Sequence, residues 1–413
     1  MIEPRRICVV TSYAAATEPR APRHAIAAKK AFPDADVVLV DLAPKGAPAG
    51  AEPALLRSHD IKRHTVEYPS RASGVARLAG RKLATRVGRA AFARFGVLHE
   101  SIFGDRARGL TRVLLNIPSD IYIAHNIDTL LPAVQAADRH GAAVVFDCME
   151  FYSDMGDGQD TTEAAAARAL EARYLGRCAL VMASSDTMAD ALGAEYGIPR
   201  PLATYNVPPT EQELPPRRGG GLNLYWRNSV IGFGQRGLED IIEALAVLPS
   251  EVHLYLQGRQ TPALASELTR RVESLGLRNR VHVLPPYAPH EAVRMAAPHD
   301  VGLCLERKGP RNHDLTVSNK MFDYHMAKLA VIATDLPGLA DVIRRSGGGL
   351  LCRPGDPASL ADPIRKLLAS PQLLGELQSN ARRFALATGN IEMEIEKISS
   401  ALKDAVARRK AAA

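Results

Sequence analysis

Short runs of β-branched and aliphatic residues alternate with alanine-rich helical stretches along the whole 413-residue chain. Strands are expected in the first half at 7–10, 37–40, 121–124, 144–146 and 180–183, and in the second half at 252–257, 281–284, 301–305 and 331–334. This alternation is typical of doubly wound parallel sheets with helices on both faces. A chain of this length exceeds the usual size of one hydrophobic core. The sequence therefore predicts an α/β protein of two domains.

A segment rich in proline and glycine, NVPPTEQELPPRRGGG at 206–221, separates the two halves. Proline and glycine in such numbers cannot continue a helix or a central strand, so this segment is the expected linker. One Rossmann-like domain is expected at 1–205 and a second at 222–388. The final segment, 389–413, carries apolar residues at helical spacing and needs an apolar surface to cover. These are Ile391, Ile395, Ile398, Leu402 and Val406.

The five cysteines lie far apart, mostly in apolar runs, and no pair has the spacing of zinc ligands. Near the start, Arg5 and Arg6 precede an apolar run of only strand length, unlike a signal peptide. No run reaches the roughly twenty apolar residues of a transmembrane helix. We therefore expect a cytoplasmic protein. The acidic residues Asp154, Asp157 and Asp160 fit a polar loop better than a metal site, and no metal is expected.

The net charge of +7 is concentrated between residues 57 and 94, where few acidic residues oppose the cations. The basic residues there are Arg57, Lys62, Arg63, Arg71, Arg77, Arg81, Lys82, Arg86, Arg89 and Arg94. Two interpretations stay open: a helix that lies on an anionic membrane, at the inner face of the cell membrane, or a solvated arginine-rich helical face. No nucleic-acid-binding pattern is present, so nucleic acid is not an expected partner.

The segment SNKMFDYHMAKLAVIATDLPGLADVI, residues 318–343, carries the clearest ligand-binding pattern. Ser318 is a good helix N-cap, and Asn319 and Lys320 fall in the first turn. Free N–H groups at a helix start, together with the charge of Lys320, suit a phosphate. Asp323, one turn further, could accept hydrogen bonds from ribose hydroxyls. An ordinary capped amphipathic helix with Lys320 in solvent is the open alternative.

The segment YWRNSVIGFGQRGLEDIIEAL, residues 225–245, has three glycines before a predicted helix. Glycines such as Gly234 permit a tight loop that a ligand approaches closely, and Arg236 would present a planar cation to a pyrophosphate. Arg227 and Arg259, the latter just after Gly258, are further candidates for the same anion. A surface turn is the alternative.

The segment 318–343 resembles the donor-binding helix of family 4 retaining glycosyltransferases, in a subgroup that writes it S-N-K-x-F-E-Y. The similarity extends to residues 225–245, 349–364 and 370–385, and in the first half to 17–42, 120–137 and 147–154. It implies the GT-B fold, with two Rossmann-like domains facing across a cleft and the C-terminal helix crossing back onto the first. It also implies metal-independent transfer of a hexose-type sugar from a UDP- or GDP-type donor, with retention.

The resemblance further implies the roles of individual residues. Arg236, Lys320 and the amides near Ser318 and Asn319 would stabilise the departing diphosphate, Gly234, Gly258 and Arg259 would line the donor site, and Asp323 would hold the ribose. His125 and Glu150 would face the sugar or the acceptor. The acceptor would be a hydroxyl of a glycan, a lipid-linked saccharide or a small metabolite, as in polysaccharide biosynthesis, and no further cofactor is expected.

The chain departs from the family pattern at three positions around the sugar. Met149 stands where the family has a histidine, Leu315 replaces the first of two paired glutamates, and Asp323 replaces the second. A thioether cannot relay a proton; Asp314 or Glu306 could replace the missing carboxylate. Two other functions therefore stay open: a non-catalytic nucleotide-sugar-binding subunit, and a sugar-nucleotide epimerase or hydrolase on the same fold.

Overall fold

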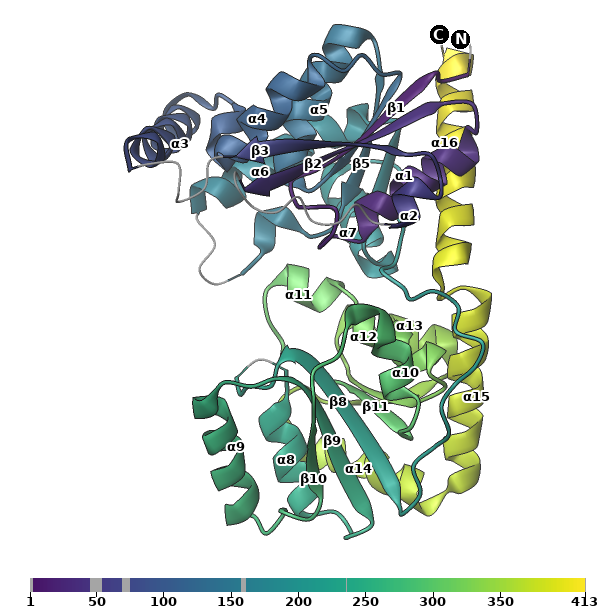
Figure 1. Ribbon diagram of the computed structural model, residues 1–413. Coiled ribbons are helices and arrows are strands. Elements are labelled where there is room, and N and C mark those ends of the chain that lie inside the picture. Colours follow the sequence, from purple (N-terminus) through teal and green to yellow (C-terminus); the bar gives the residue numbers. More distant parts are fainter. Residues whose placement is uncertain (1–2, 45–53, 69–74, 157–160, 235, 413) are drawn as a thin grey trace. The chain divides into compact units, whose positions relative to one another are not determined.

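The computed structural model describes residues 3–44, 54–68, 75–156, 161–234 and 236–412. The chain divides into two compact units (Figure 1). Unit 1 comprises Met1–Thr204, Pro310–His313 and Ile395–Ala413, and unit 2 comprises Tyr205–Gly309 and Asp314–Glu394. Each unit contains one parallel sheet with helices on its two faces.

The sheet of unit 1 has seven strands in the order β3-β2-β1-β4-β5-β6-β7, all parallel. The strands are β1 (Arg6–Thr11), β2 (Asp36–Pro44), β3 (Lys62–Tyr68), β4 (Ile121–His125), β5 (Ala143–Cys148), β6 (Leu180–Ala183) and β7 (Leu202–Ala203). The helices are α1 (Arg20–Ala31), α2 (Ala54–Arg57), α3 (Val75–Phe95), α4 (Asp105–Leu114), α5 (Ile127–His140), α6 (Thr161–Tyr174), α7 (Asp186–Tyr196) and, from Ile395 onward, α16 (Ile391–Ala412). The strand order reverses between β1 and β4.

The sheet of unit 2 has six parallel strands in the order β10-β9-β8-β11-β12-β13. The strands are β8 (Leu222–Val230), β9 (Val252–Arg259), β10 (Val281–Leu284), β11 (Val301–Cys304), β12 (Ala330–Thr334) and β13 (Gly349–Cys352). The helices are α8 (Leu238–Ala246), α9 (Pro262–Ser274), α10 (Ala292–Ala296), α12 (Asn319–Met326), α13 (Pro337–Ser346), α14 (Pro357–Ala369) and α15 (Pro371–Ala387). Helix α11 (Arg311–Leu315) lies in unit 1 up to His313 and in unit 2 from Asp314. The order reverses between β8 and β11, and ligands of such sheets bind outside the carboxyl ends of the strands at this reversal.

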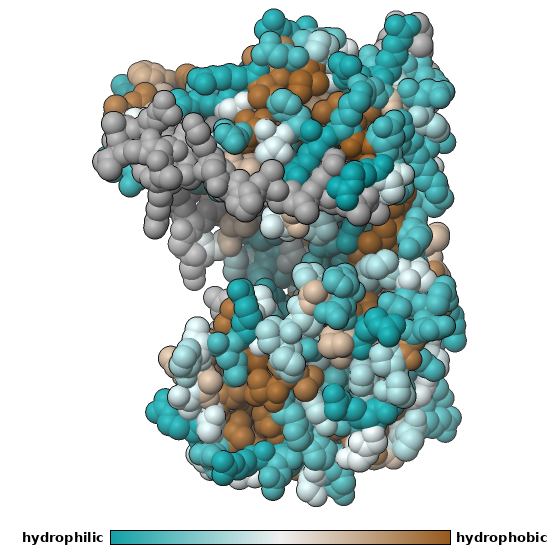
Figure 2. All heavy atoms as spheres, in the orientation of Figure 1, coloured by the Kyte–Doolittle hydropathy of each residue, from teal (hydrophilic) through white to brown (hydrophobic). Residues whose placement is uncertain are grey.

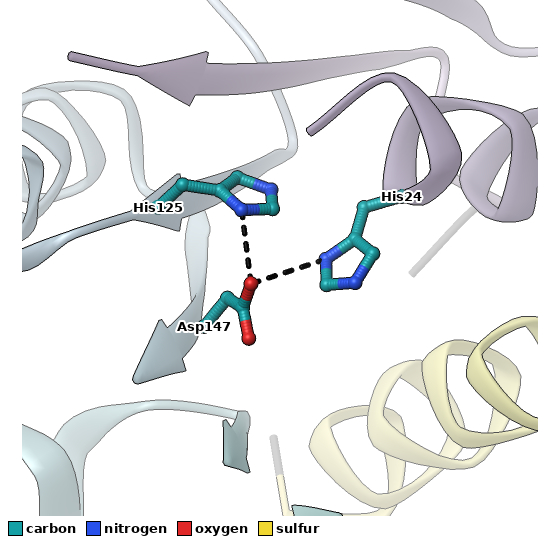
Figure 3. Close-up of side chains that lie close together, drawn as sticks. All are labelled: His24, His125 and Asp147. Carbon is teal, nitrogen blue, oxygen red and sulfur yellow. Dashed lines mark ion pairs between the residues drawn. The ribbon is translucent and has the colours of Figure 1, made fainter. Parts of the chain in front are cut away.

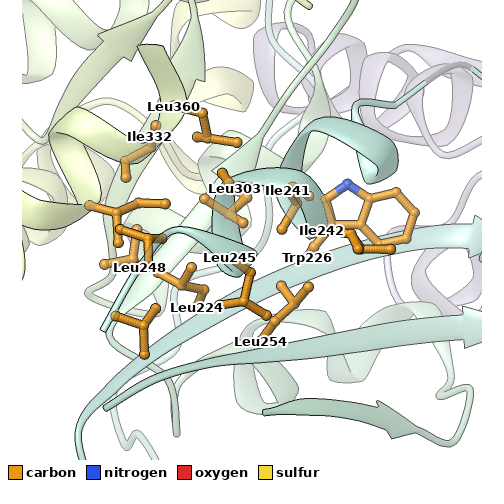
Figure 4. Packing of buried hydrophobic residues seen from close by; sticks show 14 of the residues in the cluster. Leu224, Trp226, Ile241, Ile242, Leu245, Leu248, Leu254, Leu303, Ile332 and Leu360 are labelled. Carbon is orange, nitrogen blue, oxygen red and sulfur yellow. The ribbon is translucent and has the colours of Figure 1, made fainter. Parts of the chain in front are cut away.

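Apolar periodicity explains the cores of both units. In unit 2, Ile241 and Leu245 on one face of α8 pack against Leu224 and Trp226 of β8 (Figure 4). In unit 1, Leu402 of α16 is 1% exposed and lies in the core with strand residues of the sheet. The helical spacing in the last segment therefore reflects a buried face, and burial of one such leucine contributes about 1.5–3 kcal/mol.

The predicted fold class and the nine predicted strands are confirmed. In the basic stretch at 57–94, the predicted helix is confirmed for α3, but the helical interpretation is wrong for residues 62–68. Residues Lys62–Tyr68 form the edge strand β3, because Lys62 pairs with Asp36 and Arg63 pairs with Asp41 of β2. Arg71, Asp157 and Asp160, and the side chains of Arg77 and Arg81, lie outside the described residues. Within the described ranges, no helix is both long enough and apolar enough to span a membrane.

Candidate functional site

The turn between β8 and α8 holds Arg236 in a fixed backbone conformation. Gly234 and Gly237 have φ of 103° and 66°, a region that favours glycine. A Cβ on Gly237 would also lie 2.8 Å from the Cβ of Leu305. The indole Nε1 of Trp226 donates a hydrogen bond to the carbonyl of Arg236 at 3.0 Å. The turn therefore places the guanidinium beyond the carboxyl end of β8, where it pairs with Glu306.

Glu306 and Lys320 complete a charged cluster with Arg236, which we call the cation cluster. Glu306 follows β11, is 5% exposed, and its N–H donates to Oγ1 of Thr334 at the end of β12 at 3.0 Å. Lys320 lies in the first turn of α12. Burial lowers the pKa of Lys320 to about 8, the carboxylate of Glu306 opposes this shift, and the charge of Arg236 adds to it. The cluster thus gathers two cations and one carboxylate at the strand reversal.

Ser318 occupies the N-cap position of α12, as predicted, but its side chain accepts no hydrogen bond from the helix. The Ser318 hydroxyl interacts instead with the buried thiol of Cys304. The N–H of Met321 donates to the carbonyl of Ser318 at 3.0 Å, and the first turn carries the partial positive charge of a helix start. Asn319, the next residue, is exposed. This helix start beside Lys320 has the donors and charge that bind a phosphate.

Asp323 and Arg227 form a second ion pair in unit 2. Arg227 extends from β8, pairs with the carboxylate of Asp323 on α12, and donates to the hydroxyl of Tyr287 at 2.7 Å. Asp323, the residue predicted to bind ribose, is therefore paired with an arginine. A carboxylate can accept hydrogen bonds from more than one donor. Its contact with ribose stays a prediction.

Gly258 and Arg259 lie at the end of β9. A Cβ on Gly258 would lie 2.2 Å from the carbonyl oxygen of Asn228, so close backbone approach already explains this glycine. Arg259 is exposed and donates to the carbonyl of Ser229 at a long 3.5 Å. These contacts do not join Arg259 to the cation cluster.

In unit 1, His125 lies at the end of β4 beside Asp147 of β5 and His24 of α1 (Figure 3). Its Nδ1 is 3.0 Å from the Oδ2 of Asp147, and Nδ1 of His24 is 4.0 Å from the same oxygen. His125 is 0% exposed, so its side chain presents no surface to a ligand in this conformation. The predicted contact of His125 with the sugar stays untested.

Arg20 neutralises the carboxylate at the centre of this group. Its Nε donates to Oδ2 of Asp147 at 2.9 Å, and a terminal nitrogen donates to Oδ1 at 2.6 Å. Burial alone would raise the pKa of Asp147, but Arg20 and the two histidines hold it well below its usual range. Burial lowers the pKa of His24 well below its ordinary value. We call these four residues the Arg20 network.

The ligand atoms of His24, His125 and Asp147 lie within 4.8 Å of one another, and two imidazoles with a carboxylate can hold a transition metal. Both oxygens of Asp147, however, already accept hydrogen bonds from Arg20. A metal ion would have to share that carboxylate with a guanidinium cation a few ångströms away. The arrangement therefore fits a buried ion-pair network better than a metal centre.

Glu150 follows β5, and its carboxylate accepts a hydrogen bond from Nδ2 of Asn312 at 2.7 Å. Burial raises the pKa of Glu150. Asn312, which belongs to unit 1, also accepts a hydrogen bond from the N–H of Phe151 at 2.7 Å. No motif in the sequence pointed to Asn312. Met149 and Leu315, the two departures from the family pattern, are both half-buried.

Two doubly wound parallel-sheet domains, one with a cation cluster at its strand reversal, define the GT-B class of glycosyltransferase folds. Residues 34–206 match the family model described as "Glycosyl transferase 4-like domain", and residues 230–370 match "Glycosyl transferases group 1". The two matches together span most of the chain. The protein therefore belongs to the glycosyltransferases that combine a 4-like domain with a group 1 domain.

Solved structures of the same fold cover nearly the whole chain. HepE (Alr3699) of Anabaena in complex with UDP is 16% identical, with a TM-score of 0.68 over 97% of this chain and 100% of that one. The lipopolysaccharide outer core galactosyltransferase WaaB is 14% identical (TM-score 0.67, 96% and 99%). Sucrose-phosphate synthase of Thermosynechococcus elongatus is also 14% identical (TM-score 0.65, 99% and 100%). No curated protein sequence matches the chain.

Proposed function

We propose that this protein transfers a hexose-type sugar from a UDP- or GDP-type donor to a hydroxyl acceptor, with retention and without a metal ion. The observation that carries this proposal is that two cations, Arg236 and Lys320, lie close together at the strand reversal of unit 2. They lie beside a helix start that has no side-chain cap. Structures of the similarly folded HepE contain UDP and UDP-glucose. A glycan, a lipid-linked saccharide or a small metabolite would supply the acceptor hydroxyl.

Negative charge develops on the diphosphate as the bond to the sugar breaks. Arg236, Lys320 and the first N–H groups of α12 would stabilise this charge, which lowers the barrier to departure. Asp323 would accept hydrogen bonds from the ribose hydroxyls. In unit 1, Glu150 is our candidate for contact with the sugar or acceptor, because His125 is buried in the Arg20 network.

Calorimetry with UDP and GDP tests the site assignment. Lys320→Ala and Arg236→Ala should each weaken binding by roughly 1.5–3 kcal/mol, the range for a hydrogen bond to a charged group. Lys308→Ala, which removes an exposed cation from the loop after β11, is the matched control and should leave binding unchanged. Unchanged affinity in both cluster variants would contradict the assignment.

The second candidate is a subunit that binds nucleotide sugars without turnover, which Met149 and Leu315 favour. Binding without product across a panel of donors and acceptors, also in Met149→His, would support it. An epimerase or hydrolase is distinguished from both by its product. Isomerised sugar nucleotide or free sugar would then form without any acceptor.

We also propose peripheral contact with an anionic membrane through α3. Leu83 and Val87 are 62% and 59% exposed on this helix, next to the exposed cations Lys82 and Arg86. Figure 2 shows hydrophobic and hydrophilic residues side by side where α3 lies in Figure 1. The segment Val75–Phe95 contains no acidic residue, so its charge is complementary to anionic lipid.

Flotation with phosphatidylglycerol vesicles tests this contact. Lys82→Glu combined with Arg86→Glu should abolish flotation at low salt, and phosphatidylcholine vesicles should not float the protein. The same double charge reversal at Arg270 and Lys366, both exposed in unit 2, controls for net charge. Absence of flotation by the unmodified protein at low salt would dismiss the proposal.

A further inference from the structure

We propose that Glu306 is an internal counter-anion, which occupies Arg236 in the donor-free protein and gives way to the diphosphate when the nucleotide binds. The inference rests on the proposed diphosphate site and adds that the site contains its own competitor. Glu306 would thereby weaken the affinity for the nucleoside diphosphate and hasten its release after transfer.

The position of Glu306 supports this role. It lies just beyond β11, one of the two strands at the reversal, and its side chain pairs with Arg236 from the turn after β8, the other strand. The same carboxylate also acts on Lys320 of α12. Burial lowers the pKa of Lys320, and the charge of Glu306 opposes this shift. The anion is thus in contact with one proposed phosphate ligand and close enough to act on the other.

The side chain is not needed to fix its own backbone. The N–H of Glu306 already donates to Oγ1 of Thr334, and the chain before it is held in the sheet by β11. A carboxylate that is 5% exposed beside a guanidinium would be expensive without that partner. The pair therefore neutralises the charges of both side chains.

The charges make the two anions mutually exclusive. Arg236 and Lys320 carry two positive charges when both are protonated, and Glu306 cancels one of them. A diphosphate brings further negative charge to the same two cations, and like charges at short range repel strongly in a partly buried site. Either the carboxylate rotates away from Arg236, or the diphosphate binds against its repulsion. In both cases the carboxylate opposes binding.

This assignment predicts a change opposite in sign to that of a residue that contacts the nucleotide. Glu306→Gln keeps the shape and removes the charge, so at pH 6.5, where Lys320 stays protonated without Glu306, it should tighten UDP binding in calorimetry roughly three- to tenfold and slow UDP dissociation in stopped flow. Glu306→Asp keeps the charge and should stay near the affinity of the unmodified protein. Glu267→Gln, which removes an exposed carboxylate from α9 in unit 2, should change nothing.

Unchanged or weaker UDP binding by Glu306→Gln would overturn the inference. A loss confined to UDP-glucose would also overturn it, because Glu306 would then contact the sugar rather than compete with the diphosphate. Lys320→Ala reports on the diphosphate site itself, so failure of that site appears in a different variant from failure of the counter-anion. If the unmodified protein binds neither UDP nor GDP, both proposals fall.

Discussion

Lys320 carries its charge in a partly buried place, and burial lowers its pKa to about 8. A bound diphosphate would stabilise the charged form and raise this pKa, so binding near pH 8 must take up a proton. The affinity for UDP should therefore be flat below about pH 8 and fall by up to about tenfold per pH unit above it. Calorimetry between pH 7 and 9.5, in buffers that differ in ionisation enthalpy, measures both effects.

Lys320→Arg is the control for this pH dependence. Arginine keeps its charge throughout this range, so the variant should bind UDP without the decline above pH 8. An identical decline in Lys320→Arg would assign the titration to another group.

Arg20 and Arg6 allow a comparison of buried and exposed ion pairs in one unit. Arg20 pairs with Asp147 at side-chain exposures of 8% and 0%, whereas Arg6 pairs with Asp36 at 44% and 28%. Arg20→Ala leaves a buried carboxylate without its main partner and should lower the free energy of unfolding by about 3–5 kcal/mol. Arg6→Ala should cost at most about 1 kcal/mol. Urea unfolding measures both, and equal small losses would contradict the assigned burial.

The sequence could predict single residues where a local motif carries the signal, and not where distant side chains pair. The turn glycines and the position of Ser318 at a helix start follow from local rules. The engagement of the Ser318 hydroxyl with Cys304, and of Asp323 with Arg227, depends on which strands become neighbours. His125 was expected at a ligand because it follows a strand. In the structure it is buried against His24, about a hundred residues earlier in the chain, whose ring centroid lies 4.7 Å from its own.

Secondary-structure elements show the same limit. Buried strands with continuous apolar runs, such as β4 and β5, were predicted, because both of their faces are covered. The edge strand β3, with sequence KRHTVEY, was missed because its charged residues pair with β2 rather than forming a helix. The two-residue strand β7 is too short for any periodicity, and β13 begins with glycine.

Helix α16 should contribute to the stability of unit 1 through one face. Leu402 is 1% exposed in the unit 1 core, and Lys403, the next residue, is exposed. Leu402→Ala should destabilise unit 1 by about 2–5 kcal/mol because it removes buried contacts and leaves a cavity. Lys403→Ala should be within about 0.5 kcal/mol of the unmodified protein. Denaturant unfolding, with hydrogen exchange in β1 and β4 as the readout for unit 1, measures both effects. Equal protection of these strands in the two variants would show that this face of α16 is not part of the core.

At the scale of the whole molecule, each unit has a sheet and a hydrophobic core of its own, and the proposed diphosphate site lies entirely in unit 2. A ligand stabilises the part of a protein that must be folded to bind it, by about 2.7 kcal/mol at a hundred times its dissociation constant. Saturating UDP should therefore slow hydrogen exchange in β8, α8 and α12 by up to about a hundredfold.

Peptides from β4 and β5 in unit 1 should exchange at the same rate with and without UDP, and Lys320→Ala should remove the protection in unit 2. Equal protection in both units would mean that UDP also contacts unit 1 or that the two units open as one cooperative body. Hydrogen exchange of the Leu402→Ala variant without ligand distinguishes these two cases. If the units open together, this core variant of unit 1 accelerates exchange in β8 and α12 as well; if UDP contacts both units, exchange in unit 2 without ligand stays unchanged.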